Sequence, residues 1–429
     1  PTGADMLDRI TEYAQQLAIF LPDARLCRVL GRALAGIVTH RSPIIARMAS
    51  LSASPDDQPE AAAKQLCRFF RNKRVRTQDL WRGIYHRTRM QVDQDAPAVV
   101  PALIDGVNLE KPYARTLPGL STIHKQGAPN RHGDRDLTRG YPALAVAALV
   151  GACPALTFAH LFSYVDDAFV SVKRQMRRAI LTTMAVLRGY TVRFIGDREF
   201  DDDQVMPWMA QYGHQFLVRA FRRRTIEVYD ATTQTWQRSS MQECAETLSL
   251  PAVFHAPFTH ARKKRDATIR LGYCRIRLPS AHNLECWLIV GHASIFRKPL
   301  WLLTNAPIAD LEAATALWWQ FRNRPHIEHL FRLLQERGLD IEDIRLRTQE
   351  RIEKLMAVVW AAAQFLWRLN LNLPPTARSW LRRLGGKPTD KRGSDGLYLL
   401  LYGLSALLLA DIVARLTNDT EAHRVAAWP

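Results

Sequence analysis

The sequence is short of cysteine and of long apolar runs, and each shortage narrows the class of protein. Its six cysteines are scattered, and no two of them have the CxxC spacing of a zinc or redox motif. We therefore expect reduced, mostly buried thiols in a reducing compartment. The longest apolar run, at 397–410, is about 14 residues, which is too short to span a bilayer and fits a buried helix. The start of the chain does not resemble a signal peptide, so we expect a cytoplasmic protein.

Acidic residues are scarce relative to basic ones. Lysine and arginine number 59 against 41 aspartates and glutamates, which gives a net charge of +18. A hydrophobic content of 47% with 23% charged residues is typical of a globular protein and excludes a disordered one. An excess of positive charge causes self-repulsion in the compact state and favours a polyanionic partner. We expect nucleic acid as that partner, with an anionic membrane surface as the alternative.

Changes in residue pattern divide the chain into five regions. Residues 1–95 have apolar residues at helical spacing and predict a helical region that binds DNA. Residues 96–220 alternate buried strands with helices and predict the first part of an α/β core. Residues 221–305 alternate in the β manner and predict a β-rich insertion. Residues 306–372 are expected to complete the core, and residues 373–429 to form a helical carboxy-terminal region.

Turn residues place the boundaries of single elements. Buried strands are expected at Thr191–Ile195 and Gln215–Arg219. One long helix is expected to begin at Ala309 and to continue through Gln335. The segment 376–384, between a Pro-Pro pair and a Gly-Gly pair, is expected to be a basic linker.

A basic segment with interleaved aromatic residues lies at 66–89. Its aromatic side chains can anchor a helix on the core while its basic side chains face phosphate groups. The alternative is a solvated basic face on a small helical bundle. The candidates for DNA contact in this segment are Arg68, Arg71, Lys73 and Arg74.

The stretch WWQFRNRPHIEHLFRLLQ, which ends at Gln335, places one acidic residue, Glu328, in basic and aromatic surroundings. Phe321, Arg324, Glu328 and Gln335 sit at offsets of 0, 3, 7 and 14, which repeat on one face of a helix. Such a carboxylate can hold a metal ion while the arginine holds a phosphate; the alternative is an ordinary ion pair worth a few tenths of a kcal/mol. Because Pro325 is accepted only in a first helical turn, the shared face is expected from Arg324 onward.

Two aspartates lie where strands are expected to end. Asp105 belongs to LIDGVN and Asp197 to FIGDREFDD. The ends of strands in an α/β sheet are where ligand sites form. Together with Glu328 these residues offer three hard oxygen ligands, which suit Mg²⁺ or Mn²⁺ rather than zinc. Two such ions, about 4 Å apart, activate a water molecule and stabilise the leaving oxygen when a phosphodiester is cleaved.

These motifs together resemble the DDE transposases of bacterial cut-and-paste insertion sequences. LIDGVN at 103–108 is similar to the family's first-aspartate strand, and FIGDREFDD at 194–202 to its second-aspartate motif. The residues at 321–335 resemble a signature of tyrosine, two residues, arginine, three residues, glutamate, six residues and lysine. The segment at 65–75 is similar to the family's amino-terminal region. The resemblance implies an α/β fold: a ribonuclease H-like core of mixed sheet and flanking helices, interrupted by the β-rich insertion.

The resemblance also implies roles for individual residues. Asp105, Asp197 and Glu328 would be the catalytic residues and would bind two Mg²⁺ or Mn²⁺ ions, and Arg324 would contact DNA near the reacting end. Phe321 and Gln335 stand where the family has tyrosine and lysine, so their contacts with the DNA end are expected to differ. Further DNA contacts are expected from the basic runs around the insertion and from one of its tryptophans: Arg222, Arg223, Lys263, Lys264 and Trp287. The alternative for Trp287 is a core or cross-strand packing role.

The implied function is that of a DNA transposase in the bacterial cytoplasm, at the nucleoid and away from membranes. It would bind the terminal inverted repeats of an element in double-stranded DNA, cleave at the ends with metal-activated water, and join the 3′-hydroxyl to target DNA. A homodimer on DNA is implied because two ends are held together. Two alternatives stay open: a ribonuclease H-like structure-specific nuclease, and a non-catalytic DNA-binding regulator derived from a transposase.

Overall fold

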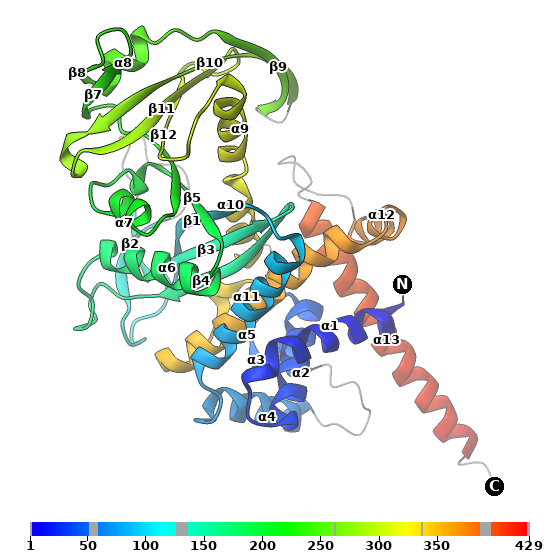
Figure 1. Ribbon diagram of the computed structural model, residues 1–429. Coiled ribbons are helices and arrows are strands. Elements are labelled where there is room, and N and C mark those ends of the chain that lie inside the picture. Colours follow the sequence, from blue (N-terminus) through cyan, green and yellow to red (C-terminus); the bar gives the residue numbers. More distant parts are fainter. Residues whose placement is uncertain are drawn as a thin grey trace.

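Twelve of the described segments are strands, and they join in one mixed sheet that is flanked by helices (Figure 1). The computed structural model describes residues 2–50, 59–125, 136–260, 263–335, 338–386 and 396–426. At 259–264 and 415–426 the side chains lie outside the described part of the chain. The predicted α/β class is therefore confirmed, with both parallel and antiparallel strand pairs.

The core strands carry both candidate aspartates. They are β1 (Val99–Glu110), β2 (Ser121–His124), β3 (Leu137–Val150), β4 (Cys153–Leu161), β5 (Thr191–Gly196) and β6 (Gln215–Arg219). β3 pairs antiparallel with β1, β2 and β4, whereas β1, β5 and β6 run parallel to one another. β3 and β4 are almost continuously buried, as expected for strands that have both faces covered. The strands predicted at 191–195 and 215–219 are confirmed.

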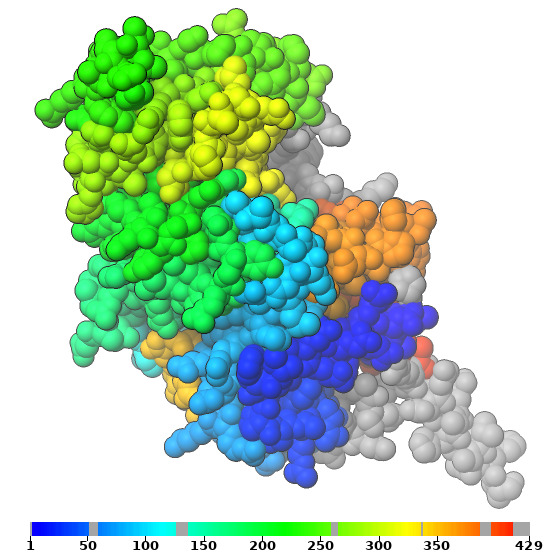
Figure 2. Space-filling view, in the orientation of Figure 1, coloured from blue at the N-terminus to red at the C-terminus, as the bar shows by residue number. Residues whose placement is uncertain are grey.

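The β-rich segment extends the same sheet instead of forming a separate layer. Its elements are β7 (Thr225–Asp230), β8 (Thr235–Ser240), α8 (Met241–Thr247), β9 (Ala252–His260), β10 (Lys263–Leu278), β11 (Leu284–Ala293) and β12 (Leu300–Thr304). β12 lies between β6 and β11, and β10, β7 and β8 follow in order, with β9 paired to β10. The space-filling view shows these strands, in green and yellow-green, at the opposite end of the molecule from the blue amino-terminal helices (Figure 2).

The described elements before residue 96 are all helical, in agreement with the periodic pattern of apolar residues. They are α1 (Gly3–Leu17), a short 3-10 turn (Ala18–Phe20), α2 (Ala24–His40), α3 (Ile45–Ala49), α4 (Pro59–Arg71) and α5 (Thr77–Asp95). α2 begins after Asp23, whose Oδ1 accepts the backbone N–H of Leu26 at 3.0 Å. Phe69 and Phe70 of α4 are almost completely buried, so aromatic residues do anchor the basic segment.

The remaining helices cover the sheet and connect its strands. They are α6 (Val172–Val186), α7 (Val205–Gln211), α9 (Leu311–Phe321), α10 (Pro325–Leu334), α11 (Gln349–Asn372), α12 (Pro375–Leu384) and α13 (Gly396–Ala426). The prediction of one helix from Ala309 through Gln335 is wrong: α9 ends at Phe321 and Pro325 opens α10. Proline lacks the backbone N–H that a helix interior needs, whereas a first turn does not use it.

The carboxy-terminal helices pack against the core. The predicted basic linker at 376–384 is wrong, because α12 occupies it and buries Leu381 against α13. The expectation that the apolar run at 397–410 is too short to span a bilayer is wrong: it belongs to the segment Gly396–Ala414 of α13, which has a mean hydropathy of 2.1 and is long and apolar enough to cross a membrane by length and composition. Its residues Leu400, Leu404 and Leu408 are fully buried against neighbouring helices, whereas Leu409 and Val413 are exposed, and 44% of the apolar window is buried.

Candidate active site

The parallel pairing of β1 with β5 brings the two candidate aspartates together. Ile104 and Gly196 form the last pair in this register, so Asp105 and Asp197 are the next residues on neighbouring strands. β1 continues to Glu110 through its pairing with β3. The expectation that Asp105 ends its strand is therefore wrong, although Asp105 does lie where the parallel pairing stops. Asp197 follows β5 directly, and its Oδ1 accepts the next backbone N–H at 2.6 Å.

Helix α10 brings Glu328 to the same edge of the sheet. Its apolar residues Ile327, Leu330 and Phe331 are buried, and α10 packs against β1, β4 and α11. Residues one turn apart share a helix face, so Arg324 at the start of α10 lies beside Glu328. The predicted face is thus present over Arg324 and Glu328, while Phe321 belongs to the preceding helix.

Arg324 lies between the three candidate carboxylates. Its Nη2 is 2.9 Å from Oδ2 of Asp105 and 3.4 Å from Oδ2 of Asp197, and its Nη1 donates a hydrogen bond to Oε1 of Glu328. In the part of the chain that the structure describes, no other arginine forms ion pairs with three carboxylates. The fold therefore gathers Asp105, Asp197 and Glu328, which are far apart in the sequence, around one guanidinium group.

Burial and charge perturb the proton equilibria of this cluster. Burial raises the pKa of Asp105 to about 7, and the nearby Glu328 and Asp197 add to the rise while Arg324 opposes it. Burial would lower the pKa of Arg324, but the charges of Asp105, Asp197 and Glu328 outweigh burial and raise it. The site is thus a concentration of negative charge that holds its own cation.

The chemistry of the donor set fits a hard divalent cation, provided that Arg324 withdraws. Carboxylate oxygens are the preferred ligands of Mg²⁺ and Mn²⁺. In the conformation described, no group of three or more His, Cys, Asp or Glu side chains among the described residues is arranged to hold a metal ion. Arg324 bridges the carboxylates instead, and its buried Nε has no hydrogen-bond partner among the described residues.

The four basic residues predicted to contact DNA near the amino terminus are accessible. Arg68, Arg71, Lys73 and Arg74 are all exposed around the end of α4. Arg74 forms an ion pair with the half-buried Asp23 at 3.2 Å, and because the Arg74 side chain is exposed, solvent weakens this pair. Their contact with DNA stays a prediction.

Other predicted DNA-contacting residues occupy more varied positions. Phe321 packs into the core with 9% of its surface exposed, which leaves little of its ring for DNA. Gln335 follows the last turn of α10 and is half-buried. Trp287 is half-buried on β11, where its ring lies 5.6 Å from that of Tyr273. The side chains of Lys263 and Lys264 lie outside the described part of the chain.

Two arginines that the sequence analysis does not single out lie beside Asp197. Arg198 follows it directly, and Arg219 ends the neighbouring strand β6. The predicted Arg222 and Arg223 come just after Arg219. Both arginines could have been predicted as site residues from the sequence. Each stands at the carboxyl end of a strand that the apolar pattern predicts, and ligand sites form at such strand ends.

Comparison with known proteins gives little further information. No family model matches the chain, and no curated protein matches it. A solved structure of a piggyBac transposase synaptic complex with hairpin DNA is similar at a TM-score of 0.40 and 9% identity, over 96% of this chain and 79% of that one. This likeness is too weak to carry a conclusion about fold or function.

Proposed function

We propose that this chain is a metal-dependent DNA transposase with a ribonuclease H-like core. The observation that carries the proposal is the meeting of Asp105, Asp197 and Glu328 around Arg324. Three carboxylates from distant segments, set beside arginines in a chain of net charge +18, suit the cleavage of a polyanion. The mixed sheet, in which the parallel strands β1 and β5 present two of the carboxylates, supports the ribonuclease H-like interpretation.

Asp105, Asp197 and Glu328 are the residues that would hold two Mg²⁺ or Mn²⁺ ions. Bound there, such ions activate a water molecule and stabilise charge on the attacking and leaving oxygens. Asp105 and Asp197 are positioned by the strand register, and Glu328 by the buried apolar face of α10. Arg324 neutralises the carboxylates before DNA arrives and then binds a phosphate close to the reacting bond.

The proposed reaction has two steps at phosphorus. In the first, water attacks a phosphodiester at the element end, the bond to the 3′-oxygen breaks, and a free 3′-hydroxyl and a 5′-phosphate remain. In the second, that 3′-hydroxyl attacks a target phosphodiester and displaces its 3′-oxygen, so one bond forms as one breaks. The exposed residues Arg68, Arg71, Lys73 and Arg74 would bind the backbone of terminal inverted repeats and target DNA. Because two ends must be joined, we propose a homodimer on DNA.

The test uses labelled duplexes that carry the DNA flanking the gene, incubated with Mg²⁺ and a plasmid target. The parent protein should yield both cleaved ends and end–plasmid joints. Asp105→Asn, Asp197→Asn and Glu328→Gln should each lose both products while still binding the duplex. Glu199→Gln is the matched control, because Glu199 is exposed in the same motif and forms no ion pair with Arg324.

One observation favours the non-catalytic alternative. Arg324 forms ion pairs with all three carboxylates and partly offsets their charge, as the cation of a purely structural cluster would. A regulator should bind the duplexes without cleaving them, whether or not the carboxylates are intact, and that outcome would replace the transposase proposal. Cleavage without joined products would instead favour a structure-specific nuclease on the same core.

A further inference from the structure

Strand register places Arg219 beside the carboxylate site. β5 and β6 are parallel, and their last pair in register is Gly196 with Val218. The next residues on the two strands are Asp197 and Arg219, which therefore lie at the same edge of the sheet. Arg219 is exposed at this edge, so its guanidinium group is available to a ligand that approaches Asp197.

Two further arginines are ordered at this edge by aromatic rings. The guanidinium carbon of Arg198 lies 5.7 Å from the centre of the Phe221 ring, and that of Arg222 lies 5.0 Å from the centre of the Trp301 ring. An arginine over an aromatic face keeps its N–H groups free at the rim of the guanidinium plane. The stacking thus orders two side chains and leaves their donors for an anion.

These three arginines are not held in ion pairs. Among the described residues, no carboxylate forms an ion pair with Arg198, Arg219 or Arg222. The Nε of Arg198 is buried without a hydrogen-bond partner. Burial lowers the pKa of Arg219, and the charges of Arg198, Arg222 and Arg324 lower it further against the opposing effect of Asp197. Crowded guanidinium groups repel one another, and a bound anion would relieve that repulsion.

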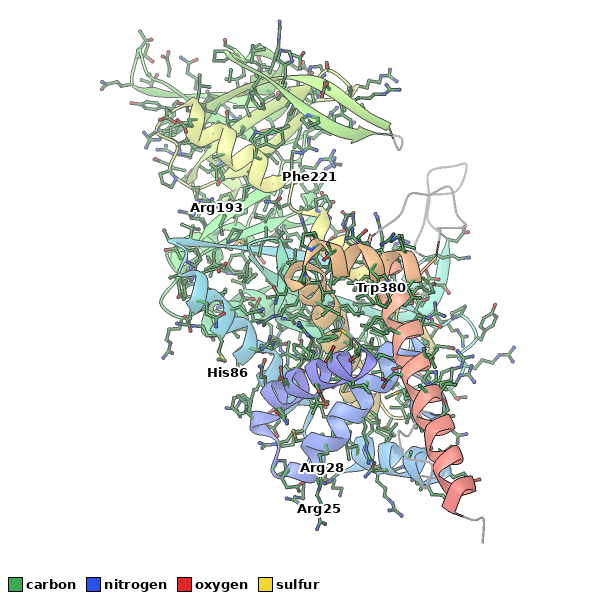
Figure 3. All side chains as sticks on the ribbon, turned by 90° about the vertical axis from the view of Figure 1, so that its right-hand side faces the viewer. Arg25, Arg28, His86, Arg193, Phe221 and Trp380 are labelled. Carbon is green, nitrogen blue, oxygen red and sulfur yellow. The ribbon has the colours of Figure 1, made fainter. Side chains whose placement is uncertain are left out.

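A buried aspartate holds the chain that carries these arginines. Asp201, with 5% of its surface exposed, accepts the backbone N–H of Phe221 at 2.6 Å and a hydrogen bond from Arg224. Arg224 also donates to Asp203, so the segment after β6 is fastened at two points. Figure 3 shows Phe221 at the level where the insertion strands meet the core strands. This anchoring fixes the backbone of the segment that follows Arg219 and carries Arg222.

We propose that Arg198, Arg219 and Arg222 form a binding site for the backbone phosphates of the DNA strand that enters the carboxylate cluster. The site rests on the proposed function, because it takes its ligand from the same DNA. Phosphodiester oxygens match the paired N–H donors of guanidinium groups. The neighbouring Arg223 is exposed, but among the described residues it neither stacks on an aromatic ring nor follows a strand beside Asp197, so the site comprises the other three arginines.

The test measures binding without cleavage, so that it does not depend on catalysis. Fluorescence anisotropy gives the Kd of the flanking-DNA duplex in EDTA at several NaCl concentrations for Arg198→Gln, Arg219→Gln and Arg222→Gln. Each variant should bind several-fold more weakly at low salt and should reduce the slope of log K against log salt by about one. Arg188→Gln is the matched control: it removes the same charge from an exposed arginine that precedes β5, at the opposite end of that strand from Asp197.

The possible outcomes separate this site from the catalytic proposal. Arg198→Lys, which keeps the charge, should retain most of the salt slope and guards against misfolding of Arg198→Gln. If the three glutamine variants keep the parent slope, or if Arg188→Gln loses as much as they do, the site is refuted. Loss of cleavage in the carboxylate variants together with unchanged arginine variants would leave the transposase proposal standing and remove only this site.

Discussion

Replacing Arg324 with glutamine tests the electrostatic design of the carboxylate cluster. Removing one partner of a buried ion pair costs about 3–5 kcal/mol. The side chains of Asp197 and Glu328 are 37% and 34% exposed, so solvent weakens their ion pairs with Arg324. The ion pair between Asp105 and Arg324, each with 15% of the side chain exposed, should therefore account for most of the lost free energy. We therefore expect Arg324→Gln to lose about 2–3 kcal/mol of unfolding free energy in EDTA.

The expected change is measurable by calorimetry or thermal fluorescence. With an unfolding entropy of about 2.1 cal/mol/K per residue over 429 residues, 1 kcal/mol corresponds to about 1 °C, so Tm should fall by about 2–3 °C. Arg332→Gln is the control, since Arg332 lies 3.8 Å from Glu328, is 57% exposed, and should change Tm by less than about 1 °C.

Adding Mg²⁺ should then raise the Tm of the Arg324→Gln variant more than that of the parent protein. In the parent, a metal ion must displace Arg324 from Asp105, whereas in Arg324→Gln the carboxylates have lost that competitor. A ligand at about one hundred times its Kd stabilises the fold by about 2.7 kcal/mol, so Mg²⁺ should recover most of the lost Tm. Burial already raises the pKa of Asp105 to about 7, and losing Arg324 raises it further, so Mg²⁺ binding at pH 7 should release a proton that an indicator dye detects. An unchanged Tm in EDTA, together with equal Mg²⁺ responses in both proteins, would refute the reasoning.

Two further predictions concern stability. Burial, aided by Arg178, lowers the pKa of His160 to about 4, so the folded protein binds fewer protons than the unfolded chain between about pH 4 and 6.5. The unfolding free energy should fall by up to about 3 kcal/mol as pH drops through that window. Urea denaturation at pH 7 and pH 4.5 should show a smaller fall for His160→Gln than for the parent protein. An equal fall in both proteins would contradict the role of His160. An added Cβ at Gly291 would lie 2.2 Å from Nε1 of Trp318, so Gly291→Ala should cost about 1–3 kcal/mol. Gly106→Ala, whose Cβ meets nothing closer than 3.8 Å, is its near-neutral control, and equal melting of both variants would count against this packing.

Local pattern was enough to predict the elements that carry the acids. The buried strands at 191–195 and 215–219 appear in the apolar runs, and Asp197 follows the first of them. The pairing of strands with distant segments could not be predicted in this way, because it depends on contacts between residues that are far apart in the sequence. The middle position of Asp105 in β1 illustrates this: the strand continues past the aspartate because β3 offers it a partner as far as Glu110.

The sequence predicts the contact of Arg324 with Glu328 but not its contact with Asp105. Its spacing from Glu328 predicts a shared face, and the structure has one. That the same guanidinium group reaches Asp105, 219 positions away, depends on how α10 packs on β1. The fastening of the arginine-bearing segment by Asp201 is equally non-local, since Asp201 and Arg224 are 23 residues apart. Charge composition predicted a polyanionic partner, but not which arginines stand beside the acids.

The continuity of the sheet makes the insertion part of the site's support. The chain leaves the core after β6 and returns as β12, which pairs with β6 at Arg219 itself. Helix α9 follows, and it is held by a 2.5 Å hydrogen bond from Arg193 of β5 to Gln320 and by the Trp318 ring over Gly291 of β11. Since α10 begins four residues after α9 ends, the insertion strands set where Glu328 and Arg324 arrive. A chain without 221–299 would therefore lose the geometry of the carboxylate cluster, in addition to any contacts that the insertion itself makes.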